Sequence, residues 1–370
     1  PRGPDPAASW SATGHRAGVR LGAAVAGAGD VDGDGYRDLL VGVPWWGGSL
    51  HGQGQARVYL GSPAGLADRP RWVVTGGQAQ AHLGAAVAGA GDVDADGFDD
   101  IIVGVPAWDG DYVDEGQARV YLGSAWGPSR TAAWQARGGQ EAAGLGTAVA
   151  GAGDTDGDGY DDVAVGVPGM DGRGADAGEV RVYAGSATGP AATATWTRTG
   201  SQAGARLGAA VAGAGDTDGD GYDDLLFGAP RYSGTASDQG RAYLHLGAAS
   251  GLASSSAWHV DGPTDGAHLG QALCALGDVD GDGYGDVAVG APGADGTGTV
   301  QVHAGSPTSL DAAAIATWSG GETGSSWGSS VAGGEDADGD GVPELIIGAP
   351  TATADGRSSA GRAVSISTPF

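Results

Sequence analysis

The chain of 370 residues carries 45 acidic residues against 18 arginines and no lysine, which gives a formal net charge of −27. This charge, without any basic run, excludes a nucleic-acid partner, because phosphate binding needs clustered positive charge. The single cysteine, Cys274, excludes an internal disulfide framework, and no apolar stretch reaches the ~18 residues of a membrane-spanning helix.

The sequence is an array of repeats. Glycine and proline make up 93 of the 370 residues, a fraction typical of disorder when a chain lacks a period. Here the segment LGAAVAGAGDVDGDGYRDLLVGVP returns in variant form every 62 residues, with a last interval of 58. The copies begin at Leu21, Leu83, Leu145, Leu207, Leu269 and Trp327. We therefore predict one domain, residues 1–370, built from six repeats of about 62 residues.

Each unit predicts four short strands. In the first unit these are a small apolar segment at 23–28, an apolar run at 39–43, an alternating segment from Gln55 and a segment that contains Trp72. Glycine-rich turns separate them, and no segment keeps a 3.6-residue period. The pattern predicts an all-β fold, a six-bladed β-propeller of four-stranded antiparallel blades with the small first strands innermost.

The ends of the chain bear on ring closure. The chain opens with a fourth-type strand around Trp10 and ends with a third-type strand from Ala360. Six complete blades result if the N-terminal strand pairs with the last blade, so we predict that this strand closes the ring. An open array cut from a longer protein is the alternative.

The motif D-x-D-x-D-G-x-x-[DE] lies between the first and second strands of every unit, and its ligand-type carboxylates, four per loop, make up 24 of the 45 acidic residues. Four carboxylates within nine residues repel one another unless a cation binds, and oxygen ligands at alternating positions suit Ca²⁺. We expect position seven to contribute its main-chain carbonyl, while glycine at position six permits the sharp turn. The predicted ligands of the six Ca²⁺ sites are Asp30, Asp32, Asp34, Tyr36 and Asp38; Asp92, Asp94, Asp96, Phe98 and Asp100; Asp154, Asp156, Asp158, Tyr160 and Asp162; Asp216, Asp218, Asp220, Tyr222 and Asp224; Asp278, Asp280, Asp282, Tyr284 and Asp286; and Asp336, Asp338, Asp340, Val342 and Glu344.

Other interpretations of these loops fit less well. An EF-hand needs a glutamate at position twelve and flanking helices, whereas that position is apolar in all six loops, as at Val41. The loops contain no histidine or cysteine, which argues against zinc or copper. A metal-free Asp/Gly turn explains one such loop, but six in register favour calcium.

With these motifs, the units resemble FG-GAP repeats, the modules of the integrin α-subunit N-terminal β-propeller. The FG element appears as Leu21-Gly22 and its equivalents, and GAP is intact at Gly228-Ala229-Pro230 and in the last two units. In that family the aspartate loops bind Ca²⁺, which the resemblance implies for the loops above. Integrin propellers have seven blades, with calcium in only some of them. This chain has six units and no leg-like region, so the resemblance does not imply a paired signalling receptor.

The second-to-third loops should lie on the face opposite the aspartate loops. They vary most between units, and loops on a rigid scaffold commonly carry recognition. Exposed Trp and Tyr suit both sugar stacking and protein hot spots. Aromatic side chains folded back onto their own blades are the alternative. The candidate ligand-binding residues are Trp45, Trp46, Trp108, Tyr112, Arg231 and Tyr232.

Four basic residues occupy one equivalent position just before the first strands: Arg20, His82, Arg206 and His268. They could ring one mouth of the central channel and attract an anion. Solvated turn residues are the simpler interpretation.

These observations predict a monomeric, non-enzymatic calcium-binding module for adhesion to a protein or glycan partner, without catalytic residues. We expect it to be extracellular or at the cell surface, secreted or periplasmic, although no export signal opens the chain. The G-x-S-x-G match at Ser326 falls between two strands, whereas a nucleophile elbow needs a strand-to-helix turn. A carbohydrate-binding lectin is the alternative, and the third interpretation is a non-catalytic propeller domain of an extracellular hydrolase or lyase.

Overall fold

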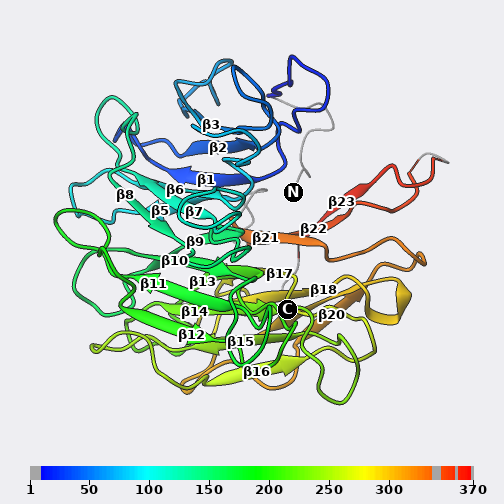
Figure 1. The fold of residues 1–370 in the computed structure, drawn as a ribbon. Helices are drawn as coiled ribbons and strands as arrows, with labels where there is room; N and C mark the ends of the chain where they lie inside the picture. The colour runs from blue at the N-terminus through cyan, green and yellow to red at the C-terminus, as the bar shows by residue number, and fades with distance from the viewer. Residues whose placement is uncertain (1–9, 336–342, 355–356, 368–370) are drawn as a thin grey trace.

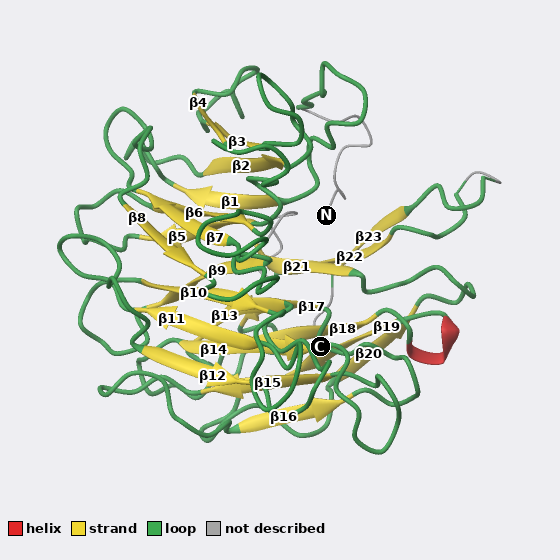
Figure 2. Ribbon diagram, in the orientation of Figure 1, coloured by secondary structure: helices red, strands yellow, loops and turns green. Residues whose placement is uncertain are grey.

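The computed structural model describes residues 10–335, 343–354 and 357–367, and it arranges six antiparallel sheets as the blades of a ring (Figures 1 and 2). Each repeat forms one sheet, whose strands follow one another in chain order. The only helical element in these residues is one 3₁₀ turn, η1 (Ala294–Gly296). The prediction of an all-β, six-bladed propeller is confirmed.

We number the blades 1 to 6 in chain order. The first strands are β1 (Val25–Gly29), β5 (Val87–Gly91), β9 (Ala148–Gly153), β13 (Ala210–Gly215), β17 (Ala272–Gly277) and β21 (Ser330–Glu335). The second strands are β2 (Asp38–Val43), β6 (Asp100–Val105), β10 (Asp162–Val167), β14 (Asp224–Ala229), β18 (Asp286–Ala291) and β22 (Glu344–Ala349). The third strands are β3 (Gln55–Tyr59), β7 (Gln117–Tyr121), β11 (Glu179–Tyr183), β15 (Arg241–His245), β19 (Thr299–His303) and β23 (Arg362–Ile366). The fourth strands are β4 (Trp72–Thr75), β8 (Trp134–Arg137), β12 (Trp196–Thr199), β16 (Trp258–Asp261) and β20 (Ala316–Ser319).

The small residues of the first strands let six strands crowd around one axis. A Cβ added at Gly151 of β9 would lie 2.9 Å from the carbonyl oxygen of Gly89 in β5, so only glycine permits this approach. One mouth of the channel, a cavity of about 570 Å³, lies at the aspartate loops. The opposite mouth, about 420 Å³, is lined by residues that precede or begin the first strands of all six blades. The innermost position predicted for these strands is therefore confirmed.

The hydrophobic core lies between neighbouring blades. The second strands are apolar runs, and all six residues of β6 are buried. In one cluster, Val58 and Trp72 of blade 1 pack with Ile101 and Tyr121 of blade 2. Equivalent clusters join each later pair of neighbouring blades up to blade 6. Each of these five consecutive pairs of blades thus buries the faces that meet between them, as expected for a repeat fold.

A tryptophan at the outer edge of each of blades 1 to 4 connects it to the next blade. The Trp72 indole packs edge-on against Tyr121 with a centroid separation of 5.0 Å, and its Nε1 donates to the Ser129 carbonyl at 2.8 Å. Trp134 makes the same pair of contacts with Tyr183 and the Ala191 carbonyl. Histidine replaces the tyrosine in the next two pairs, Trp196 with His245 and Trp258 with His303. These contacts fix the angle between neighbouring blades.

The predicted closing strand lies only partly within the described residues. The described part of the last sheet has three strands, β21–β22–β23, and residues 10–13 form no strand. Trp10 nevertheless contacts Tyr59 and donates to the Ala67 carbonyl at 3.0 Å, so it docks on blade 1 as the other tryptophans dock on their neighbours. This is the contact that a fourth-strand tryptophan makes with the next blade, whereas residues 10–13 make no ladder hydrogen bonds with β23.

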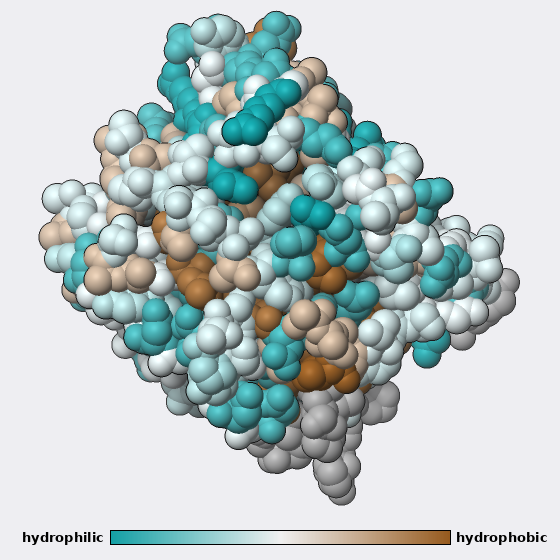
Figure 3. All heavy atoms as spheres, turned by 90° about the horizontal axis from the view of Figure 1, so that it is seen from below, coloured by the Kyte–Doolittle hydropathy of each residue, from teal (hydrophilic) through white to brown (hydrophobic). Residues whose placement is uncertain are grey.

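The surface seen in Figure 3 mixes hydrophilic and pale residues with small hydrophobic patches. In the part of the chain that the structure describes, no helix has the length and apolar character needed to cross a membrane.

Candidate functional site

The aspartate loops are ordered by their own side chains. The Asp30 carboxylate accepts the amide hydrogens of Asp34 at 3.0 Å and Gly35 at 2.8 Å, and Asp34 accepts the amide of Tyr36. The second loop repeats these bonds with Asp92 and Asp96, and loops three to five share the pattern. Each of these five loops is therefore ordered by contacts within seven residues.

Five of these loops gather carboxylate oxygens that lie within 4.8 Å of one another. In the first loop the cluster comprises positions one, three and nine, and in the next four it comprises positions one, three and five. The clusters are Asp30, Asp32 and Asp38; Asp92, Asp94 and Asp96; Asp154, Asp156 and Asp158; Asp216, Asp218 and Asp220; and Asp278, Asp280 and Asp282. The structure thus brings together three of the four predicted carboxylates in each of these loops.

The third position of the loop shows that these clusters fit a cation. Asp32 Oδ1 and Asp94 Oδ1 are buried and accept no hydrogen bond from the described residues. Burial raises the pKa of both carboxyls, and the neighbouring carboxylates raise it further. Crowded, partly desolvated carboxylates with an oxygen that accepts no hydrogen bond are the environment that a bound cation stabilises. The donor set, which consists only of oxygen, suits Ca²⁺.

The ninth position connects each loop to the rest of its blade. Asp38 is buried at the start of β2, where its carboxylate accepts the amide of Val31 at 3.0 Å and that of Gly61 at 2.7 Å. Asp100 accepts the equivalent pair of hydrogen bonds. Burial raises the pKa of Asp38 to about 6 and that of Asp100 to about 7, against the lowering effect of these hydrogen bonds.

The sixth loop falls mainly outside the described residues. Of its predicted ligands, Asp336, Asp338, Asp340 and Val342 lie outside them, and Glu344 is a buried residue at the start of β22.

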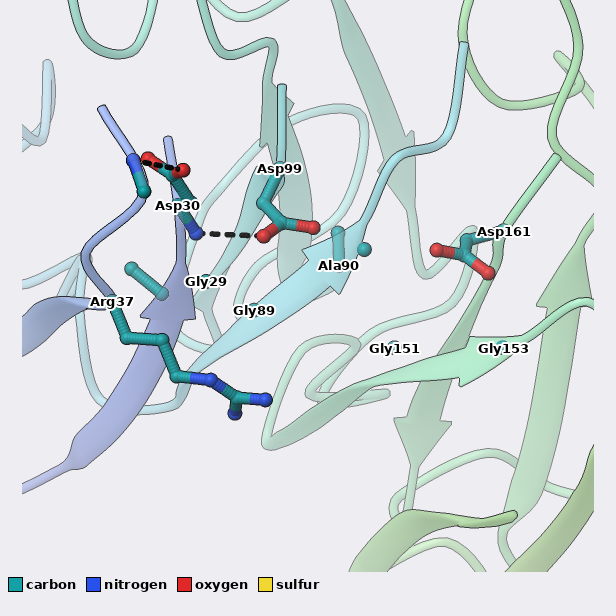
Figure 4. Close-up of a pocket in the computed structure, with 12 residues that line it drawn as sticks. Gly29, Asp30, Arg37, Gly89, Ala90, Asp99, Gly151, Gly153 and Asp161 are labelled. Carbon is teal, nitrogen blue, oxygen red and sulfur yellow. Dashed lines mark hydrogen bonds between the residues drawn. The ribbon is translucent and has the colours of Figure 1, made fainter. Parts of the chain in front are cut away.

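Sequence reasoning missed the eighth position of the loop. The Asp99 carboxylate accepts the amide hydrogen of Asp30 in the preceding blade at 2.6 Å (Figure 4). Asp161 and Asp223 bond in the same way to Asp92 and Asp154, at 2.9 and 3.0 Å. Burial raises the pKa of Asp161 and Asp223. The available signal was the Asp-Asp pair in units two to four, where unit one has Arg37 and unit five has Gly285.

Three eighth-position residues, Arg37, Asp99 and Asp161, line the cavity at the aspartate-loop mouth of the channel. Its wall includes Gly29, Gly91 and Gly153, and the side chains of Arg37 and Asp161 extend toward it from blades 1 and 3 (Figure 4). The neighbouring loops therefore meet around one opening instead of standing apart.

The candidate ligand-binding residues divide into two groups. Trp45 and Tyr112 are 37% and 50% exposed, and Arg231 is exposed as well. Trp46 is half-buried. Trp108 and Tyr232 pack against interblade clusters, and Arg119 and Arg241 cover their rings at 4.9 and 4.1 Å. Trp108 and Tyr232 therefore fit the alternative interpretation, in which aromatic side chains fold back onto their own blades.

The possible nucleophile elbow lacks its required setting. Ser326 has a φ of 53° in a turn between β20 and β21, and its hydroxyl accepts a hydrogen bond from Thr351 at 3.0 Å. No helix follows it, so this serine lies outside the geometry that a G-x-S-x-G nucleophile requires.

A match to a known protein family agrees with the strands and loops described above. The family model described as FG-GAP repeat matches residues 21–60, 83–122, 145–183, 207–245, 269–303 and 327–365. The chain belongs to the FG-GAP repeat family. Each matched segment of this FG-GAP propeller begins just before a first strand and ends in or next to a third strand, so it contains one aspartate loop.

Among curated proteins, the FG-GAP propeller is similar to integrin α subunits. It is 39% identical to integrin alpha-PS2 of Drosophila melanogaster over 155 residues, which is 38% of this chain and 10% of that protein. It is 34% identical to integrin alpha-V of Gallus gallus over 220 residues, 56% of this chain and 20% of that protein. The matched region thus spans between a tenth and a fifth of these relatives.

Among solved structures, two rhamnogalacturonan lyases are similar at low sequence identity. The PL11 enzyme of Bacillus licheniformis has a TM-score of 0.41 at 17% identity and covers 81% of this chain and 55% of its own. The lyase YesW has a TM-score of 0.42 at 16% identity and covers 87% and 55%. Neither likeness bears on what this chain binds.

Proposed function

We propose that this FG-GAP propeller is a calcium-stabilised, non-enzymatic binding or adhesion module that works outside the cell or at its surface. The observation that supports the proposal most is the repetition of one carboxylate cluster in five described loops at one end of the ring. The sequence similarity to integrin α subunits supports a role in adhesion. The extracellular setting also supplies the calcium concentration that such sites need.

Each calcium site would use the carboxylates of positions one, three, five and nine and the carbonyl of position seven. The bound ion supplies positive charge to a cluster that otherwise holds only like charges. The chain's own residues do the rest. The Asp30 carboxylate orders the turn, Asp38 ties the loop to its blade, and Asp99 ties it to the next blade. The sixth site would be formed by Asp336, Asp338, Asp340, Val342 and Glu344.

The partner site of this proposal lies on the opposite face. The loops between second and third strands differ in sequence, and two of them expose Trp45 and Tyr112 above a rigid scaffold. Exposed aromatic side chains on ordered loops are typical anchors of protein interfaces. A protein partner is therefore our first choice, and a glycan is the alternative outcome of the test.

The test compares capture of binding partners by three proteins in calcium. The first is the unmodified chain, and the second is the Trp45→Ala/Tyr112→Ala variant. The control is Trp126→Ala, because Trp126 is 83% exposed on a connection beside the aspartate loops. Truncation of an aromatic anchor costs at least ~2 kcal/mol, about thirtyfold in affinity, so capture should fall only with the double variant.

Soluble extracellular proteins and a glycan array are offered in parallel, each with and without chelator. Capture of glycans alone would indicate a lectin. Equal capture by all three proteins would contradict the proposed face, and capture that persists in chelator with an unchanged melting temperature would contradict the calcium dependence.

A further inference from the structure

Twelve residues surround the channel mouth opposite the aspartate loops, two from each blade, and we call them the rim. One rim residue per blade directly precedes the Leu-Gly or Trp-Gly pair, and the other follows the proline after the second strand. In order around the ring the rim consists of Arg20, Trp45, His82, Ala107, Gly144, Gly169, Arg206, Arg231, His268, Gly293, Ser326 and Thr351.

Hydrogen bonds place the first kind of rim residue at the mouth. The carbonyl of Arg20 accepts the amide of Ala23, and the carbonyl of Arg206 accepts that of Ala209. Ala23 and Ala209 both line the 420 Å³ cavity at this mouth. The basic residues predicted to ring one mouth of the channel are therefore positioned at that mouth.

The second kind of rim residue fills the spaces between them. The Trp45 ring lies 5.1 Å from the Arg20 guanidinium and 4.2 Å from the His82 ring. On the other side of the ring, the amide of Arg231 donates to the Ala205 carbonyl, next to Arg206. The Pro230 carbonyl, next to Arg231, lies 3.1 Å from His268 Nδ1. Each contact joins neighbouring rim positions.

The rim has a charge opposite to that of the chain. It holds three of the 18 arginines and two of the seven histidines but none of the 45 acidic residues. The basic residues form two groups. Arg20 and His82 enclose Trp45 on blades 1 and 2, and Arg206, Arg231 and His268 follow one another on blades 4 and 5. Within the described residues, neither Arg206 nor Arg231 has a side-chain ion pair.

Acidic residues next to the rim make no ion pair with these groups in the described part of the chain. Asp114 acts on His82 electrostatically, and Asp176 and Asp238 accept the amides of Arg206 and His268 through their main-chain carbonyls. All three belong to the second-to-third loops outside the rim, and their carboxylates form no ion pair with rim residues in the described part of the chain.

The backbone conformation at the rim also indicates that the basic side chains have a functional role. Arg20, His82, Arg206 and His268 have φ angles between 53° and 57°, the left-handed region that favours glycine. Blade 3 has Gly144 at the equivalent position, with a φ of 63°. A long basic side chain held in this region carries a conformational cost, and such positions cluster at functional sites.

We infer that the rim is an anion-binding mouth that receives an acidic segment of a protein partner, with carboxylates reaching both basic groups. The inference rests on the proposed binding function and names the chemistry of its ligand. Arginine matches a carboxylate with a fork of N–H donors, and Trp, Tyr and Arg are the residue types enriched at protein hot spots.

The mouth favours a peptide over an acidic polysaccharide. Alanine and valine dominate its lining, as at Ala86, Val87, Ala148 and Val149. The methylene groups of Glu side chains can pack there, whereas sugar hydroxyls would lose hydrogen bonds to water without gaining partners. An apolar wall also strengthens the attraction between charges at its edge.

The test measures binding of labelled poly-L-glutamate and of alginate, an acidic polysaccharide, to the full chain in excess calcium. The rim variant is Arg206→Gln/Arg231→Gln. The matched control, Arg69→Gln/Arg130→Gln, removes the same charge from exposed residues of the third-to-fourth connections beside the aspartate loops. We expect poly-L-glutamate to bind, to weaken with added salt, and to lose at least about fivefold in affinity with the rim variant alone.

Three outcomes would overturn the inference: no binding of poly-L-glutamate, binding of alginate alone, or an equal loss with the rim and control variants. The proposed function is judged separately. A partner from the capture experiment that binds the rim variant with unchanged affinity would overturn the anion-binding mouth and leave the binding module standing.

Discussion

The Asp99 carboxylate accepts the main-chain amide hydrogen of Asp30 at 2.6 Å, although the two residues are 69 positions apart and belong to neighbouring blades. In return, the Asp99 amide donates to the Asp30 carbonyl at 3.2 Å. Asp30 is also the first proposed ligand of its loop. One aspartate of blade 2 thus holds the start of the aspartate loop in blade 1, which couples loop order to blade packing.

We expect Asp99→Ala to lower the free energy of unfolding by about 1–2 kcal/mol, because it removes a charge-assisted hydrogen bond between blades. Asp99→Asn keeps an acceptor oxygen and should recover much of the loss. Asp68→Ala, at an exposed position on a third-to-fourth connection, is the control. Denaturant unfolding in calcium measures all three, and equal stability of the alanine variants would contradict the role of Asp99.

Chelation should destabilise the whole ring. A ligand at ten times its Kd adds about 1.4 kcal/mol per site, so the five described clusters together contribute roughly 7 kcal/mol. This is comparable to the stability of a typical domain. We expect excess chelator to lower the Tm by roughly 10 °C or more. Magnesium should restore little, because it prefers smaller octahedral sites. A calorimetric scan that is the same with and without chelator would refute the calcium sites.

Because the carboxyl of Asp100 is buried, we expect the stability of the fold to respond to pH in opposite directions with and without calcium. Burial raises its pKa to about 7, whereas an unfolded aspartate titrates near about 3.9. Without calcium, the native state therefore binds this proton between these values while the unfolded state does not, so stability rises as the pH falls from 7 toward 4. With calcium, protons compete for the carboxylate, and the same acidification should lower the Tm.

Asp100→Asn provides the reference for this pH prediction, because it cannot titrate. Burial lowers the pKa of His245 and His303, so these groups favour unfolding below about pH 6.5 in both proteins. The difference in Tm between the wild-type chain and the variant removes their contribution. A difference that does not change with pH in chelator would show that Asp100 titrates normally.

We expect the interblade tryptophans to supply most of the stabilisation at each contact between two blades. Trp134 is 8% exposed and contacts both Tyr183 and the Ala191 carbonyl, whereas Trp126 of the same blade is 83% exposed. We expect Trp134→Ala to cost about 3–5 kcal/mol and Trp126→Ala to change stability by less than about 0.5 kcal/mol. Similar unfolding midpoints for the two variants would contradict this assignment.

Trp10 should contribute less than Trp134, although it makes the same two kinds of contact. Residues 10–13 form no strand, so part of the contact energy of Trp10 is lost to the freedom of an unpaired backbone. We expect Trp10→Ala to cost about 1–2 kcal/mol and to increase association between molecules, since the edges of the first and last blades become more accessible. Sedimentation and thermal unfolding test this. A loss equal to that of Trp134→Ala would indicate that the segment pairs fully with the last blade.

The sequence by itself determined the blades and the aspartate loops of this protein. The period of 62 residues defines six units, and the strands follow from apolar runs separated by glycine turns. The bonds that shape a loop, from Asp30 to Gly35, span five residues, so local composition is enough to specify them. Carboxylates at alternating positions in such a turn are brought together wherever the turn forms, which is why most predicted ligands of the described loops meet.

Only the tertiary structure decided what depends on how neighbouring blades meet. The bond of Asp99 to Asp30, the packing of Trp108 against an interblade cluster and the place of Arg231 between Arg206 and His268 all join segments from different strands or blades. Ring closure is of the same kind: the Trp10 indole docks on blade 1 as a fourth-strand tryptophan docks on the next blade, while residues 10–13 form no strand. Such contacts depend on the angle between packed blades, and side-chain packing across the whole ring sets that angle.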